Sequence, residues 1–163
     1  MASARPTVLI FSHGGIDGGH GNIKYAANTY QAEFCEPTVT PIQLLEDHPA
    51  VQAIWIVDHD IMLSIHKHIS DRVVNYAGNG GTVILGGWFS STMSPRVFSR
   101  WMEKAWNLPW RCGEVRTATV FLRDPAIGPH PNWQHALARS YHQKSTFLKN
   151  VSPTESWYTS VLA

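Results

Sequence analysis

A nine-residue segment that begins at His13 holds five glycines, two histidines and one aspartate. Glycine has no side chain, so such a loop lets the backbone approach a ligand closely and leaves its N–H groups free to bind an anion or a carbonyl oxygen. We therefore predict that Gly14, Gly15 and Asp17 bind a substrate, and that His13 or His20 transfers a proton. The alternative is a flexible turn, because the segment matches neither a dinucleotide-binding fingerprint nor a Walker A loop.

A second polar cluster, Asp58-His59-Asp60, directly follows an apolar run. Carboxylates and imidazoles are common acid–base groups, so we predict a catalytic role for Asp58 and a substrate-binding role for His59. The competing interpretation is structural, since an aspartate that follows a strand often caps the next helix. These histidines and aspartates lack the tight local spacing of zinc ligands, and we predict neither a metal nor a cofactor.

The third candidate segment follows the apolar run Thr82–Leu85, where a strand-to-helix turn is the usual position of a nucleophile elbow. The motifs G-x-S-x-G and G-x-C-x-G are both absent, and Trp88 occupies the position after the two glycines. We predict that Gly87, Trp88 and Ser90 bind substrate, with Trp88 and Phe89 as an apolar wall. Ser90 has the alternative of a local hydrogen bond.

The two cysteines are predicted to be packing residues rather than nucleophiles. A catalytic thiolate needs a lowered pKa, which a helix N-terminus or a neighbouring cation provides. Cys35 instead lies near Glu33 and Glu36 at the end of a predicted helix, and Cys112 lies in a predicted loop.

Five short apolar runs are expected to be the strands that position these loops, and helical patterns separate most of them. Parallel strands bring their carboxyl ends to one edge of a sheet, so the candidate loops should surround one cavity there. The runs are Thr7–Ser12, Thr38–Ile42, Ala53–Val57, Thr82–Leu85 and Thr117–Leu122.

Apolar residues at helical spacing predict helices over Ile23–Phe34 and Ile61–Tyr76. A third helix should begin after Ser94 and reach Ala105, with Pro95 in its first turn. Asn132 can cap a short helix through Arg139, and the capping box that begins at Ser152 predicts a final helix.

A length of 163 residues fits a single domain. The net charge of +1 and the scattered basic residues give no case for nucleic acid, and no apolar stretch is long enough for a membrane span. Two cysteines without a disulfide framework favour a cytoplasmic location. Only 15% of residues are charged and seven are Trp, so we predict a homodimer.

Three segments resemble the class I glutamine amidotransferase-like superfamily, which includes the ThuA-like proteins and other branches without the cysteine. They are Val8–Gly15, Ala53–Asp58 and Gly80–Trp88, and the resemblance spans residues 7–124. It implies that residues 1–163 form one such domain, a flavodoxin-like three-layer α/β sandwich with a central, mainly parallel sheet of about five strands.

The chain departs from the amidotransferases at the elbow, where Trp88 replaces their cysteine, and no His-x-Glu dyad follows. Without a thiol no thioester intermediate can form, so a glutaminase is excluded from the hypothesis. The preferred hypothesis is binding of a small polar metabolite at the carboxyl edge of the sheet, with hydrolase or lyase activity. The alternative is a binding or assembly protein without catalysis.

Overall fold

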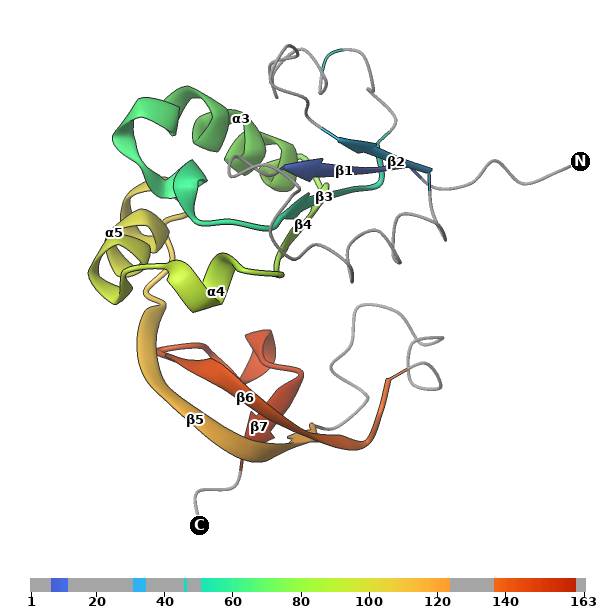
Figure 1. Cartoon of the computed structure of the whole chain (residues 1–163), viewed down its shortest axis with the longest axis vertical. Coiled ribbons are helices and arrows are strands. Elements are labelled where there is room, and N and C mark those ends of the chain that lie inside the picture. The colour runs from blue at the N-terminus through green and yellow to red at the C-terminus, as the bar shows by residue number, and fades with distance from the viewer. Residues whose placement is uncertain (1–6, 12–30, 35–45, 47–50, 124–136, 161–163) are drawn as a thin grey trace, which may run out of the picture.

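The computed structural model describes residues 7–11, 31–34, 46, 51–123 and 137–160. These residues form two separate sheets, one parallel and one antiparallel, with the helices packed beside the parallel sheet (Figure 1). In this part of the chain, no helix has the length and apolar character needed to cross a membrane.

The parallel sheet has four short strands in the order β2-β1-β3-β4. Its central strands are apolar on both faces, and Leu9, Ile10 and Ile54 are buried, as a central strand of a parallel sheet requires. The strands are β1 (Thr7–Phe11), β2 (Gln31–Phe34), β3 (Ala53–Ile56) and β4 (Thr82–Leu85).

The chain crosses from β3 to β4 through two 3₁₀ turns, η2 (Asp60–Met62) and η3 (Ser64–His66), and then α3 (Lys67–Gly78). These turns delay the α-helix, which begins six residues after the predicted start at Ile61. Gly80, with a φ of +92°, follows the helix in the left-handed conformation that glycine adopts without strain.

After β4 come the single turn α4 (Phe89–Thr92) and the longer helix α5 (Pro95–Ala105). Ser94 and Pro95 occupy the predicted N-cap and first helical positions, although the Ser94 side chain makes no capping bond. The apolar stripes of α3 and α5 pack against the sheet face that carries Leu9 and Ile54.

The antiparallel sheet has the order β6-β5-β7. It is built on the long strand β5, which pairs with β6 along most of its length and with β7 at its end. Val120 is its only buried hydrophobic residue in the described chain. Its strands are β5 (Arg111–Leu122), β6 (Ser140–Lys149) and β7 (Tyr158–Ser160).

The predicted flavodoxin-like sandwich with one mainly parallel sheet of about five strands is wrong. The fifth apolar run, Thr117–Leu122, belongs to β5 and pairs antiparallel in the second sheet. Thr117 and Thr119 alternate with Ala118 and Val120, and alternation of polar with apolar residues is typical of an antiparallel strand with one face in water. A strand of the parallel core would be apolar throughout.

Three further predictions are corrected. Gln31–Phe34 is a strand parallel to β1 rather than the end of a helix, and Leu137–Arg139 is not helical. The capping box at Ser152 is present, but it caps the 3₁₀ turn η6 (Pro153–Glu155) and the strand β7 follows. The predicted strand Thr38–Ile42 lies outside the described residues.

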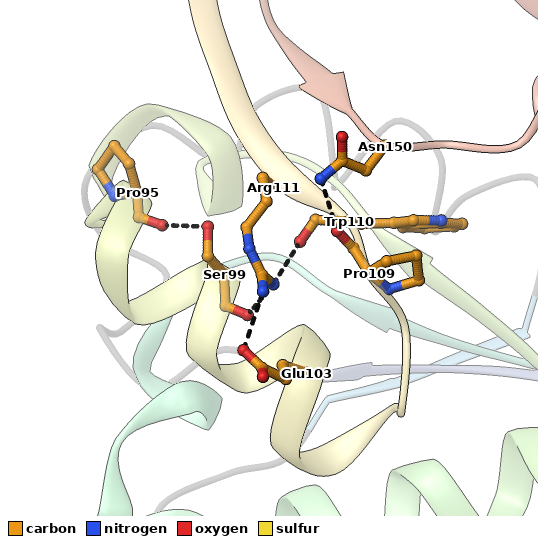
Figure 2. Close-up of polar contacts among 7 residues, drawn as sticks. All are labelled: Pro95, Ser99, Glu103, Pro109, Trp110, Arg111 and Asn150. Atoms are coloured by element: carbon orange, nitrogen blue, oxygen red, sulfur yellow. Dashed lines mark hydrogen bonds and ion pairs between the residues drawn. The ribbon is translucent and has the colours of Figure 1, made fainter.

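Arg111 joins α5 to the start of β5 (Figure 2). Its guanidinium donates hydrogen bonds to the carbonyl oxygen of Ser99 at 3.0 Å and to the carboxylate of Glu103 at 2.9 Å. Asn150, at the end of β6, donates from Nδ2 to the carbonyl oxygen of Pro109 at 3.3 Å. Polar contacts therefore connect the second sheet to the helical layer of the first.

Candidate functional site

Three of the parallel strands end together at one edge of their sheet. Beyond the last residue of β3, the Val57 amide donates to the carbonyl oxygen of Phe11 at 3.1 Å. Beyond β4, the Gly86 amide donates to the carbonyl oxygen of Ile56 at 3.0 Å. The carboxyl ends of β1, β3 and β4 therefore lie side by side.

The strand order makes the ends of β1 and β3 a distinct position. The chain moves from β1 to β2 on one side, and β3 then pairs with the other side of β1. In open parallel sheets, ligands bind in the crevice at such a reversal of strand order, outside the carboxyl ends. Asp58 and His59 occupy this position, one and two residues after the bond between Val57 and Phe11.

A carboxylate and an imidazole lie together after β3. The Nε2 atom of His59 is 3.6 Å from an Asp60 carboxylate oxygen, and both side chains are about one-third exposed. The exposure leaves the imidazole ring accessible to a bound molecule. This places His59, predicted only as a binding residue, in a geometry suited to proton transfer.

Asp58 also has a structural role, which was the alternative to a catalytic one in the sequence analysis. One of its carboxylate oxygens accepts a hydrogen bond from the Asp60 amide at 3.3 Å, which forms an Asx turn at the start of η2. The Asp58 side chain is also partly exposed, so a ligand at this edge of the sheet can reach it. The structural and functional interpretations of Asp58 are therefore compatible.

The turn after β4 presents one of its two aromatic residues to solvent. Gly87 has a φ of +63°, a conformation that turns the chain and that other residues adopt only with strain. Trp88 follows and is 47% exposed, whereas Phe89 is buried against Phe98 and Trp101. Phe89 therefore does not join Trp88 in an apolar wall, and Ser90 is exposed on α4.

Trp55 contacts this edge and was not among the predicted site residues. A Cβ atom placed on Gly86 would lie 2.8 Å from the indole Nε1 atom of Trp55. That nitrogen is buried and has no hydrogen-bond acceptor among the residues that the structure describes. A sequence signal existed, since a tryptophan interrupts an otherwise aliphatic strand and two glycines follow the next strand.

The glycine-rich loop lies outside the described residues, and so do its five predicted site residues. Their roles stay predictions. The residues concerned are His13, Gly14, Gly15, Asp17 and His20. In the part of the chain that is described, no group of three or more His, Cys, Asp or Glu side chains has a geometry that could hold a metal ion.

Cys112 lies within β5 rather than in a loop, and its thiol is not in a disulfide. Burial raises the pKa of the Cys112 thiol. A raised pKa lowers the thiolate fraction at neutral pH, which is the opposite of what a nucleophilic cysteine requires. Cys35 lies outside the described residues.

The arrangement defines an α/β protein whose polar residues meet at the carboxyl edge of a parallel sheet. Comparison with protein-family models, with curated proteins and with solved structures finds no match to this chain. The geometry of the chain itself therefore carries the functional argument.

Proposed function

We propose that the chain binds a small polar metabolite at the carboxyl edge of its parallel sheet and acts on it as a hydrolase or lyase. One observation carries the proposal: Asp58, His59 and Asp60 follow β3 at the point where the strand order reverses. This is the position where open parallel sheets bind small molecules. Here it holds carboxylates, which accept hydrogen bonds, and an imidazole, which can donate or accept one.

In this proposal the residues after β3 and β4 have different roles. The carboxylates of Asp58 and Asp60 accept hydrogen bonds from ligand hydroxyl or amino groups, and His59 donates or removes a proton. The exposed indole of Trp88 supplies an apolar wall from the neighbouring strand end. The predicted His13 and His20 would complete the site from the loop after β1.

We propose that the chain is related to the branches of the glutamine amidotransferase-like superfamily that lack a catalytic cysteine. Trp88 at the elbow cannot form a thioester, and the raised pKa of Cys112 disfavours a substitute thiolate. A glutaminase is therefore not proposed. A cytoplasmic location, supported by the unpaired thiol of Cys112, completes the proposal.

The test is a ligand screen of the full chain by saturation-transfer NMR with a library of polyols, hydroxy acids and amino acids. The variants Asp58→Asn and His59→Gln should lower the affinity for a ligand found in the screen at least about tenfold, because each removes one or two charged hydrogen bonds. Asparagine retains the side-chain oxygen that accepts the Asp60 amide, so Asp58→Asn preserves the turn.

Matched controls are Glu114→Gln on β5 and His68→Gln on α3, both exposed and both on elements away from this edge. They should bind the hit as the parent chain does. Hits that all four variants bind with unchanged affinity would overturn the site, and so would a complete absence of hits. A hit that binds but is not turned over would overturn the hydrolase or lyase activity and retain the binding site.

Assembly without catalysis is the second candidate function, and one observation favours it. Val115, Phe121 and Leu148 are exposed hydrophobic residues of the antiparallel sheet, and its pairing register places them on one face. A second copy of the chain covering this face would give the predicted homodimer. Three of the tryptophans pack with the core and are not available for an interface; they are Trp101, Trp106 and Trp110. The homodimer is therefore proposed from this exposed face and not from the number of tryptophans.

Light scattering of the parent chain and of a Val115→Thr, Phe121→Thr double variant tests this candidate. The parent should have the mass of a dimer and the variant that of a monomer. The control is Ile65→Thr, which removes a hydrophobic side chain that is 71% exposed in η3. A monomeric parent at high concentration would refute the assembly.

A further inference from the structure

A groove of about 420 Å³ runs between η2, α3 and α5, on the helical layer of the parallel sheet. Its walls come from the segment Ile61–Ser64, from the start of α3 and from one side of α5. In Figure 1, α3 and α5 lie next to one another at the same side of the molecule. None of the residues assigned to the candidate site lines this groove.

The floor of the groove is apolar. Ile61, Met62 and Trp101 line it and are largely buried, and Leu63 at its margin is 40% exposed. Ser70 also lines it, and its hydroxyl accepts the Trp101 indole N–H at 2.7 Å. The indole is therefore held in place, and its ring offers a fixed apolar surface to an occupant.

The margin formed by α5 is cationic. Arg96, Arg100 and Lys104 line the groove and are four residues apart, so one face of the helix carries a positive charge about every 6 Å. All three are exposed, and no described carboxylate is within ion-pair distance of them. Glu103 on the same helix is bound instead to Arg111.

The opposite margin carries one neutralised pair. Lys67 contacts the Asp71 carboxylate at 2.6 Å, and both residues line the groove. The lining of the groove therefore has four cationic side chains and one carboxylate, whereas the whole chain has a formal charge of only +1. The groove therefore has a local excess of positive charge.

We propose that this groove binds an acidic amphipathic helix of another protein. An apolar floor fits the apolar stripe of such a helix, and charges at a four-residue interval fit carboxylates that repeat at the same interval on the partner. A nucleic acid would need only the charges and not the apolar floor, so the combination favours such a helix. A membrane surface would need apolar residues that protrude rather than a recess.

The probe is a fluorescein-labelled amphipathic peptide of about 16 residues, which spans about 24 Å as a helix. It carries Glu at every fourth position and Leu on the adjacent face. The matched peptide has Gln in place of each Glu. Fluorescence anisotropy of the full chain with the Glu peptide should saturate, and the affinity should fall as salt is raised because screening weakens exposed charges.

The decisive variant is Arg96→Glu, Arg100→Glu, Lys104→Glu, which should weaken binding of the Glu peptide at least about tenfold. Its matched control reverses three exposed cations near or on β6: Arg139→Glu, Lys144→Glu and Lys149→Glu. Leu63→Ser should weaken the binding of both peptides, since it removes apolar contact without changing the charge of the groove. The altered side chains are exposed, so circular dichroism should be unchanged for every variant.

Several results would overturn the proposal. These are equal affinity for the Glu and Gln peptides, equal weakening of binding by the two triple variants, or no saturation at about 1 mM peptide. Tighter binding to phosphatidylserine vesicles or to a 16-nucleotide RNA that is lost in the α5 variant would assign the charges to a different class of partner.

Discussion

The two sheets of this protein differ in how much apolar surface they bury. In the described chain, the parallel sheet and its helices hold every buried hydrophobic residue except Val120. The antiparallel sheet instead exposes large hydrophobic residues such as Val115 and Phe121. The first unit is therefore stabilised by a packed core, and the second depends on strand pairing and on its polar contacts to α5.

The largest expected effect lies in the core of the first unit. Ile54→Ala removes a side chain that is fully buried beneath the helices and should lower the free energy of unfolding by about 2–5 kcal/mol. Val115→Ala, on the exposed face of β5, should change it by less than about 0.5 kcal/mol. Urea denaturation followed by far-UV circular dichroism measures both, and similar costs would remove the contrast between the sheets.

The next effect concerns the buried polar residue of the first unit. Ser70→Ala removes the acceptor of the Trp101 indole N–H and leaves that buried donor unsatisfied, which should cost about 1–3 kcal/mol. Ser99→Ala is the matched control, because its hydroxyl only returns to the Pro95 carbonyl oxygen of its own helix. Tryptophan fluorescence during denaturation reports both variants. Equal stability of the two variants would mean that a water molecule accepts the Trp101 indole N–H in place of Ser70.

A third prediction tests how strongly the two units are coupled. Arg111→Ala removes the contacts with Ser99 and Glu103 and should cost about 1–2 kcal/mol, since the guanidinium is partly exposed. Unfolding should also become less cooperative, because these contacts join β5 to α5 (Figure 2). Arg100→Ala, an exposed arginine of α5 without a described ion pair, is the control. Identical denaturation curves for the two variants would show that the sheets are joined by other contacts.

The same contrast explains what the sequence predicts well. The strands β1, β3 and β4 are continuous apolar runs, and α5 has a repeated apolar stripe, so local patterns are sufficient to identify them. The sequence also predicts that the Asp58-His59-Asp60 cluster and the Gly86–Trp88 turn lie at the strand ends, because both follow such runs directly, while their functional roles stay predictions. Their positions at one edge follow from the parallel pairing of β3 with β4.

The second sheet was missed because its pairing depends on residues far apart in the chain. β6 is polar along much of its length, with Ser140, His142 and Lys144 among its residues, so it lacks an apolar run. Without that partner in view, the apolar residues of β5 suggest one more strand of the parallel sheet, and only the alternation of Thr117 and Thr119 with apolar residues indicates otherwise. The Trp55 contact with Gly86 was missed for a similar reason, since strand register decides which side chain lies beneath that glycine.

The smallest expected effect comes from a motif that was recognised correctly but assigned to the wrong element. The Ser152 hydroxyl accepts the Thr154 amide at 3.3 Å, and the Glu155 carboxylate accepts the Ser152 amide at 2.9 Å. The same carboxylate oxygen accepts the Trp110 indole N–H at 3.2 Å, so the capping box also ties the approach to β7 to the residue before β5.

Ser152→Ala should therefore cost about 0.5–1 kcal/mol, the usual loss of a helix cap, while retaining the bond between Glu155 and Trp110. Glu155→Ala removes both functions of the carboxylate and should cost more than Ser152→Ala. Glu155→Gln keeps an oxygen that can accept both bonds and loses only their charge assistance, so it should cost the least of the three. Denaturation midpoints of the three variants give the order. If Glu155→Ala were no worse than Ser152→Ala, the contact with Trp110 would contribute nothing to the free energy of unfolding, and the other contacts of β7, such as the bond from the Tyr158 hydroxyl to the Ala138 carbonyl oxygen, would hold this end of the second sheet.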